Sequence, residues 1–590
     1  MMKELKMIKK GNKKLIVAIF GVLFFALPFF VFAYSSGAQN KFYLEQDFDK
    51  NDRETIYATI RYVSTNAYFY IENQWWEGLP TESRDSLNAK LADLAKHFDL
   101  EIYPKMTDAF GSEWKPGIDG DYKITILFHQ MKNEAAGYFR TIDEYPTIQA
   151  PGSNEREMIY LNTEVFNHSY PESYIAHEFM HLITFNQKNR QTGKDEDIWL
   201  NELRAEYVST LLGYDAEYTA TNLQNRVRNF IDYPNDPLAE WKGSVTDYGV
   251  ISMFGQYLVE HYGINILRDS LSSQSVGLVS LDYALAKNNI KKNIAEVFTD
   301  WLIAISTNDC ALGKEYCYDN DFLNAIKVAP SLIYLPSTQE SHLSLIYTIK
   351  EWSGNWYKIV GGDKGLKVEF RGLTSKSFIV PYLIERANKI QSVNFLTLDK
   401  DNKGTIELPY FGENNQSLIL LPVIEKKVSD FSDNEPLWRF SLSVSTFENG
   451  NSGNNEEPEP EPEPKPISQM TIAELRAKIL EIQKMLVVLL AELQKIKGET
   501  ADCSRIDNNL YFGIANNIEV KCLQEFLKNQ GTNIYPEGLI TGNFYSATKQ
   551  AVIRFQEKYV SEILLPFGLQ NGTGYVGIST RNKINQLLGN

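Results

Sequence analysis

The stretch YIAHEFMHLITFNQ (residues 174–187) places two of the chain's 7 histidines four residues apart. Residues at this spacing lie on one face of an α-helix. His177 and His181 can therefore direct ring nitrogens at a single metal ion about 2 Å away. Glu178 stands between them, in the position that a general base takes beside such an ion. The alternative is an ordinary helix with buried, hydrogen-bonded histidines, and a third ligand would decide between the two.

A second helical segment, IWLNELRAEYVSTLLG (198–213), offers acidic candidates for that ligand. Glu202 and Glu206 are four residues apart, hence on one face. A carboxylate from a following antiparallel helix completes a His₂Glu zinc site with one open position for water, and Glu202 is the predicted ligand. Glu206 is predicted to accept a hydrogen bond from the other ring nitrogen of a ligand histidine. Taken alone, the sequence of this segment is also typical of an ordinary helix whose acidic face is exposed to solvent.

The two segments together resemble the gluzincin clan of zinc metallopeptidases, and most closely the hyicolysin-type secreted enzymes. The resemblance covers most of residues 40–330 and includes three further stretches: AAGYFRTIDEYP (135–146), NEREMIYLNTEVF (154–166) and TDYGVISMFGQYLVEHYG (246–263). It implies an α+β, zincin-like metallopeptidase domain over residues 34–330 that binds one Zn²⁺ per chain.

By the same resemblance, the metal ligands are His177, His181 and Glu202, and Glu178 is catalytic. Leu203 departs from the pattern, since such enzymes often carry glycine after the ligand glutamate. The GxMEN-type motif of the related aminopeptidases is absent from the sequence, which favours cleavage within a protein or peptide substrate.

A mechanism follows from these parts. Zinc activates water and polarises the scissile carbonyl group, while Glu178 moves the proton from water to the leaving amine. The developing oxyanion needs a second donor. Tyr248 is the candidate, with His261 and His168 as rivals; ordinary packing is the alternative explanation for Tyr248. The stretch AAGYF (135–139) is either the sheet edge that holds an extended substrate or an interior strand or loop.

The rest of the chain divides by pattern. Residues 331–447 contain short β runs separated by turns, which predicts a β-sandwich domain. The Glu-Pro-rich composition of residues 448–467 predicts an extended linker. Residues 468–498 carry four heptads of apolar residues, which predicts either a coiled coil with self-association or a helix packed on a neighbouring domain.

Residues 499–590 resemble the three-helix peptidoglycan-binding domain of wall-associated hydrolases. The matching elements are Leu523, Gln524, Thr541, Gly542, Thr548, Ala551, Val552, Phe555, Gln556 and Thr580. Most of these positions account for folding alone. The resemblance implies peptidoglycan as a partner, although the stretch 560–574 is longer than the usual connection.

Composition and targeting signals limit the function classes. The net charge of −16 argues against nucleic acid as a partner. A basic start and an apolar run predict a signal peptide over residues 1–33, with an uncleaved membrane anchor as the alternative. Outside the cytoplasm, Cys310 with Cys317 and Cys503 with Cys522 are predicted disulfides. Zinc binding by these cysteines is the alternative, but no CxxC pattern or nearby histidine supports it.

We therefore expect a secreted zinc metalloendopeptidase that is associated with the cell wall or cell surface. Two other readings stay open: a hydrolase of peptidoglycan cross-links, and a catalytically inactive wall-binding or adhesive surface protein.

Overall fold

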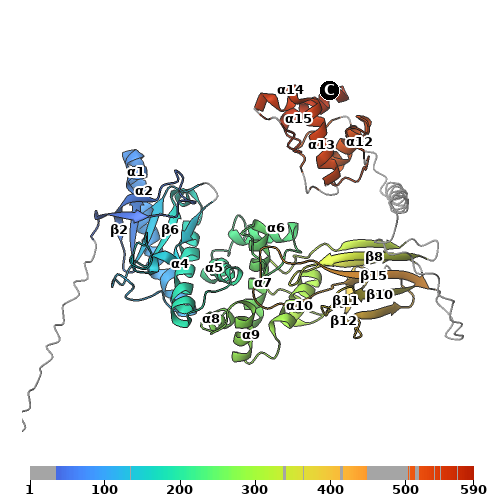
Figure 1. Ribbon diagram of the computed structural model, residues 1–590, viewed down its shortest axis with the longest axis horizontal. Coiled ribbons are helices and arrows are strands. Elements are labelled where there is room, and N and C mark those ends of the chain that lie inside the picture. Colours follow the sequence, from blue (N-terminus) through green and yellow to red (C-terminus); the bar gives the residue numbers. More distant parts are fainter. Residues whose placement is uncertain are drawn as a thin grey trace, which may run out of the picture. The chain divides into compact units, whose positions relative to one another are not determined.

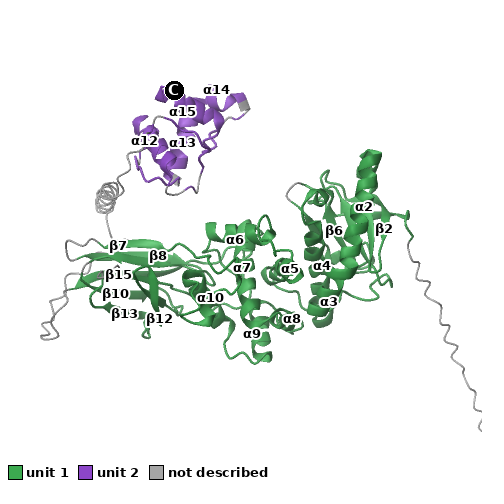
Figure 2. Cartoon of the chain, turned by 180° about the vertical axis from the view of Figure 1, so that it is seen from behind, with its two compact units in different colours: residues 1–452 green, residues 453–590 purple. Residues whose placement is uncertain are grey.

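The computed structural model describes residues 35–132, 135–335, 341–362, 364–411 and 416–447, and most of 503–589 (Figure 1). The chain forms two compact units, residues 1–452 and 453–590 (Figure 2). The predicted signal peptide, Glu-Pro linker and heptad helix lie outside the described residues, so these three segments and self-association through 470–498 stay predictions. None of the helices within the described ranges is both long and apolar enough to cross a membrane.

The first unit begins with a six-stranded sheet in the order β1-β2-β3-β4-β6-β5. Strands β3, β4 and β6 run parallel and are buried along their whole length, which explains their continuous apolar character. Strand β5 pairs antiparallel with β6 and lies at the edge. The strands are β1 (Gln39–Tyr43), β2 (Thr55–Val63), β3 (Ala67–Glu72), β4 (Ile124–His129), β5 (Gly137–Phe139) and β6 (Met158–Asn162).

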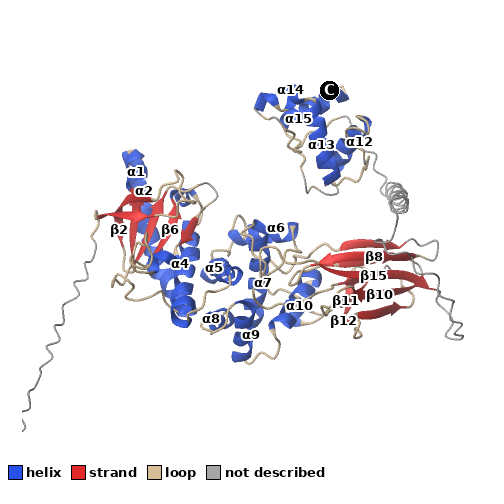
Figure 3. Ribbon diagram, in the orientation of Figure 1, coloured by secondary structure: helices blue, strands red, loops and turns tan. Residues whose placement is uncertain are grey.

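Helices cover this sheet and continue beyond it (Figure 3). Helix α4 contacts β5 and β6 on one side and α5 on the other, so most of its residues are buried. A π-helical turn, η4 (Phe185–Arg190), follows directly and continues the helix beyond Thr184. The helices are α1 (Asn73–Gly78), α2 (Thr81–His97), α3 (Tyr103–Phe110), α4 (Pro171–Thr184), α5 (Ile198–Leu212), α6 (Asn222–Asp232), α7 (Val245–Tyr262), α8 (Asn265–Leu271), α9 (Gly277–Lys287) and α10 (Ile294–Thr307).

Residues 331–447 form two sheets, in the orders β13-β10-β15-β8 and β12-β11-β14-β9-β7. Apolar residues of both sheets share one buried cluster, which is the arrangement of a sandwich. Trp352 and Trp356 join the core of the preceding helices, so this region and residues 34–330 belong to one compact unit. The strands are β7 (Ser331–Leu335), β8 (His342–Ile349), β9 (Tyr357–Gly361), β10 (Gly365–Gly372), β11 (Pro381–Arg386), β12 (Lys389–Phe395), β13 (Lys403–Leu408), β14 (Ser417–Leu420) and β15 (Trp438–Phe447).

The second unit is helical and contains an internal repeat. The carboxamide of Gln524 accepts from the backbone N–H groups of Thr541 and Gly542 and donates to Thr548. Gln556 makes the same bonds to Thr573, Gly574 and Thr580, 32 residues later. Each glycine has a positive φ, 78° and 73°, which suits the tight turn. The helices are α12 (Ile518–Asn529), α13 (Ser546–Lys558), the short α14 (Val560–Ile563) and α15 (Ile578–Leu588).

Both predicted cysteine pairs are confirmed as disulfides. Cys310 bonds to Cys317, and Cys503 bonds to Cys522. Such bonds are typical of proteins that fold outside the reducing cytoplasm. The sulfur atoms of Cys310 and Cys317 lie near Asp319 in a cluster of ligand-type atoms, but their disulfide leaves no thiolate to bind a metal.

Candidate metal centre

Helix α4 presents both histidines of the motif to one side. The ring centroids of His177 and His181 are 5.0 Å apart, and the rings are nearly perpendicular, at 80°. Pro171 begins the helix with its φ already suited to the first turn. Glu172 places a negative charge in that turn, which stabilises the helix. The spacing of the motif therefore has the geometric effect that the sequence predicts.

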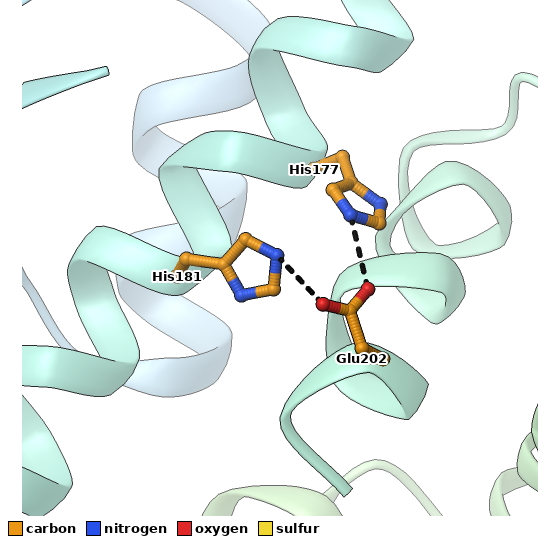
Figure 4. A group of neighbouring side chains, drawn as sticks. All are labelled: His177, His181 and Glu202. Atoms are coloured by element: carbon orange, nitrogen blue, oxygen red, sulfur yellow. Dashed lines mark ion pairs between the residues drawn. The ribbon is translucent and has the colours of Figure 1, made fainter. Parts of the chain in front are cut away.

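Glu202, on helix α5, lies between the two rings (Figure 4). Its Oε2 is 3.4 Å from Nε2 of His177, and its Oε1 is 3.6 Å from Nε2 of His181. One ligand atom from each of the three side chains falls within 4.8 Å of the others. Two imidazoles and one carboxylate are a donor set that zinc accepts. Oε2 of Glu202 is also buried without a hydrogen-bond partner among the described residues, so the residues present fit a bound cation.

Glu206 lies behind His177, at the position that the sequence predicts. Its Oε1 is 3.6 Å from Nδ1 of His177. The guanidinium of Arg226, on α6, donates to both carboxylate oxygens of Glu206, at 2.7 and 2.8 Å. Asn222, one turn earlier on α6, donates to Oε2 at 2.8 Å. Burial would raise the pKa of Glu206, but the charge of Arg226 lowers it, so this carboxylate stays ionised beside the histidine.

Arg226, Asn222 and Asn201 are residues of this region that the sequence did not reveal. The side chain of Asn201 contacts His181, as Glu206 contacts His177. The four-residue spacing of Asn222 and Arg226 places them on one face of α6. The sequence shows this four-residue spacing, but it does not indicate that Glu206 is the partner of these two side chains.

Glu178 lies under the edge strand of the sheet. The side chain is only 7% exposed, and burial raises its pKa to about 7, although the charge of His177 opposes the shift. A β-carbon on Gly137, in β5, would lie 2.8 Å from Oε1 of Glu178. Only a glycine therefore allows the strand to approach the carboxylate this closely. The structure shows the stretch AAGYF to include an edge strand, so the interior-strand reading is wrong.

The ionisable groups of His177, His181 and Glu202 shift one another's pKa values. Burial would lower the pKa of His177, but its contact with Glu202 and the surrounding carboxylates raise it to about 9. Burial would raise the pKa of Glu202, but His181, His177 and Tyr248 lower it to about 2. The pKa of His181 is lowered, mainly by burial. At neutral pH the carboxylate of Glu202 is therefore ionised and lies against one protonated ring, His177, and one neutral ring, His181.

Tyr248 borders this cluster. Its hydroxyl group interacts with Glu202, and the guanidinium carbon of Arg226 lies 4.4 Å from the centre of its ring. Burial and the negative charges of Glu202 and Glu206 raise its pKa, so the hydroxyl remains a donor at neutral pH.

The two rivals of Tyr248 have other surroundings. His261 follows Tyr248 by 13 residues on the same helix, which is about 20 Å along the axis, and its Nε2 is 2.9 Å from the carbonyl oxygen of Cys317. His168 is exposed, with Nδ1 3.2 Å from the hydroxyl of Tyr174. The geometry therefore favours Tyr248 over His261 as a group near Glu202.

No family model matches the chain, and no curated protein matches it. Among solved structures, it is similar over 20% of its length to 98% of PliG, a periplasmic inhibitor of g-type lysozyme from Aeromonas hydrophila, at 13% identity and a TM-score of 0.14. It is also similar over 20% of its length to 96% of the pre-peptidase C-terminal domain of a Bacillus anthracis collagenase, at 9% identity and a TM-score of 0.13. A family GH115 4-O-methyl-α-glucuronidase matches over 55% of this chain and 51% of its own, at 8% identity and a TM-score of 0.12. At these TM-scores the similarities support no conclusion about function.

Proposed function

We propose that the chain is a secreted zinc metalloendopeptidase with a zincin-like catalytic region of the gluzincin type. The observation that carries the proposal is the convergence of His177, His181 and Glu202 beside the buried acid Glu178. These three ligands would hold the zinc ion, and Glu206 would orient the ring of His177. A bound zinc ion supplies Lewis acidity, which activates water and polarises a carbonyl group.

The remaining chemistry belongs to the protein's own side chains. Glu178 accepts a proton from the attacking water and returns it to the leaving amine, a role that suits a carboxyl group with a pKa of about 7. The Tyr248 hydroxyl donates a hydrogen bond where negative charge develops. The edge strand β5 would bind an extended peptide through backbone hydrogen bonds, and its closeness to Glu178 supports attack on a peptide bond held there.

We further propose that the second unit attaches the enzyme to peptidoglycan. The support is the resemblance of residues 499–590 to peptidoglycan-binding domains, together with the repeated glutamine-centred turn. The predicted signal peptide and the two disulfides support the proposal that the enzyme acts outside the cytoplasm, at the cell wall or cell surface.

One experiment separates the three readings of the chain. Residues 34–590 are incubated with casein and with isolated murein, with and without a zinc chelator. The same is done for Glu178→Gln and for a control on the same helix, Glu172→Gln. Chelator-sensitive casein cleavage that is lost in Glu178→Gln supports the proposal. Murein cleavage alone indicates a cross-link hydrolase, and no cleavage indicates an inactive wall-binding protein.

Metal analysis adds a readout that does not depend on activity. Glu178→Gln is expected to keep one zinc ion per chain, because Glu178 is not a ligand. Glu202→Gln is expected to lose zinc, because an amide is a poor zinc ligand. If Glu202→Gln retained zinc with unchanged affinity, the assignment of the third ligand would be wrong.

A further inference from the structure

The segment that joins β1 to β2, residues 44–54, reaches the far edge of the first sheet. Strand β1 forms one edge of this sheet and β5 forms the other. The backbone N–H of Glu45 donates to the hydroxyl of Tyr138, in β5, at 3.2 Å. The ring of Phe48 stacks on the ring of Tyr138, with centroids 5.0 Å apart and planes inclined by 26°. Segment 44–54 therefore contacts a strand with which neither β1 nor β2 pairs.

Strand β5 has little support from the sheet itself. It is three residues long and has one neighbour among the described strands, β6. A pair this short is marginally stable without further packing. Tyr138 stacks on Tyr160 of β6, with centroids 4.4 Å apart and planes inclined by 11°, and it stacks on Phe48 as well. The segment thus adds a second ring contact and a hydrogen bond to the middle residue of β5.

The chain on both sides of β5 is attached to the same part of the molecule. Before the strand, the backbone N–H of Lys132 donates to the carbonyl oxygen of Phe48 at 3.0 Å. After the strand, the guanidinium of Arg140 donates to the carbonyl oxygen of Tyr43, the last residue of β1, at 3.2 Å. Residues 43–48 therefore contact the chain before β5, within β5 and after β5.

The segment is itself held in one shape. Asp49 is fully buried, and its Oδ1 accepts from the backbone N–H groups of Asn51 and Arg53 at 2.9 and 3.0 Å. The guanidinium of Arg53 donates to Oδ2 of Asp49 at 2.8 Å, and it also donates to Glu72 at the end of β3. Such charge-assisted hydrogen bonds are strong. Because they join the segment to a buried strand, it can act as a fixed support for β5.

The two faces of β5 have different neighbours. Successive side chains of a strand point to opposite faces. A β-carbon on Gly137 would meet Glu178, whereas Tyr138 packs with Phe42 and other apolar residues of a separate buried cluster. A shift of the Tyr138 ring would therefore also move Gly137 and the backbone groups of β5 relative to Glu178.

We propose that Phe48 and Tyr138 are positioning residues for the peptidase reaction, which hold β5 where it binds the substrate beside Glu178. The inference rests on the proposed function, in which β5 is the strand that binds the peptide. Without the Phe48 ring, β5 would be in place for only a fraction of the time. The apparent affinity for the peptide would fall by the same fraction. The loss of one aromatic contact corresponds to about 3- to 10-fold.

Phe48→Ala is the test, because this side chain is 40% exposed and contributes little to the buried core. KM and kcat are measured with a fluorogenic peptide on the full exported chain with zinc. KM should rise about 3- to 10-fold, while kcat stays within about twofold. Phe48→Tyr keeps the ring and should match the unmodified chain. Tyr57→Ala removes an exposed ring from β2, which does not neighbour β5, and it should match the unmodified chain too.

Hydrogen–deuterium exchange reports on β5 without a substrate. In Phe48→Ala, the backbone amides of residues 135–140 should exchange about 3- to 10-fold faster, whereas those of α4 should be unchanged. Tyr138→Phe is a second variant, which keeps the stacked ring and removes the acceptor of the Glu45 N–H. It should also speed exchange in residues 135–140.

Each outcome has one meaning. Unchanged exchange of residues 135–140 in both variants would overturn the proposal. Faster exchange with an unchanged KM would overturn it as well, since the contacts would then serve folding alone. Faster exchange throughout the first unit would do the same, because it indicates general destabilisation. If the unmodified chain cleaves no peptide, the proposed function fails and the positioning role fails with it, while the exchange rates still decide whether the segment holds β5.

Discussion

Replacing Gly137 by alanine tests the contact between the edge strand and the proposed general base. An added β-carbon would lie 2.8 Å from Oε1 of Glu178, 2.9 Å from Cγ of Glu178 and 2.8 Å from the backbone oxygen of Tyr160. Ordinary contacts begin near 3.4 Å, so the strand or the Glu178 side chain must shift by about 0.6 Å. Tyr160 lies in the buried strand β6, so it cannot move away.

A displacement of this size matters because Glu178 must meet the water and the substrate together. A misplacement of about 1 Å can cost about 10²-fold in rate, so we expect Gly137→Ala to lower kcat/KM by about 10- to 100-fold. The assay is cleavage of a fluorogenic peptide, with zinc content and thermal unfolding measured on the same preparation. Zinc should stay at one per chain, because the three atoms nearest to the new methyl group belong to Glu178 and Tyr160, and neither residue is a proposed ligand.

Gly78→Ala is the matched control, since a β-carbon at Gly78 would meet no atom within 4 Å. It should leave kcat/KM unchanged. The reasoning about β5 would be refuted if Gly137→Ala kept kcat/KM within about threefold of the unmodified chain. Loss of zinc in Gly137→Ala would refute it in another way, since the defect would then lie in the metal site.

Three further predictions concern buried polar groups. Burial raises the pKa of Glu425 from 4.5 to about 8. The folded state therefore loses stability as the pH rises from about 4.5 to about 8, and the loss at pH 7 is about 3 kcal/mol. In urea unfolding, Glu425→Gln should remove this dependence of the unfolding free energy on pH between about 4.5 and about 8. Arg226→Met removes the charge that holds Glu206, and should weaken zinc binding by about 10- to 100-fold in a chelator competition. Gln556→Leu leaves the backbone N–H groups of Thr573 and Gly574 without an acceptor. Thermal unfolding should show the second unit destabilised by about 2–4 kcal/mol. Gln524→Leu should have the same effect, because its hydrogen bonds are equivalent.

The parts of the site that could be predicted are those governed by helical spacing. His177 and His181 share a face because they are four residues apart, and Glu202 and Glu206 share one for the same reason. That the two faces meet depends on how α4 and α5 pack, and the sequence supplied this only through a family resemblance. Arg226 could not be predicted, because an arginine on a polar helix face carries no mark of its partner.

Some features of the fold could likewise be predicted from the sequence, and others could not. Short β runs separated by turns predicted a sandwich in 331–447, and two sheets are present there. The pattern could not predict that Trp352 and Trp356 would enter the helical core, because an apolar residue in a turn does not indicate which surface it covers. Gln524 and Gln556 were recognised as elements of a family pattern, but their equivalence depends on hydrogen bonds to turns 17 residues away.

Buried acids of the first unit differ in how their negative charge is balanced. Glu206 forms an ion pair with Arg226. Glu240, which is 2% exposed, forms an ion pair with the amino group of Lys350 at 2.6 Å. Both cases follow the rule that a buried carboxylate needs a charged donor. Glu144 is buried as deeply as Glu240, yet the side chain that meets it is another acid. Burial and the neighbouring negative charges raise the pKa of both Glu144 and Glu157, so this pair is balanced by a retained proton and not by a basic side chain.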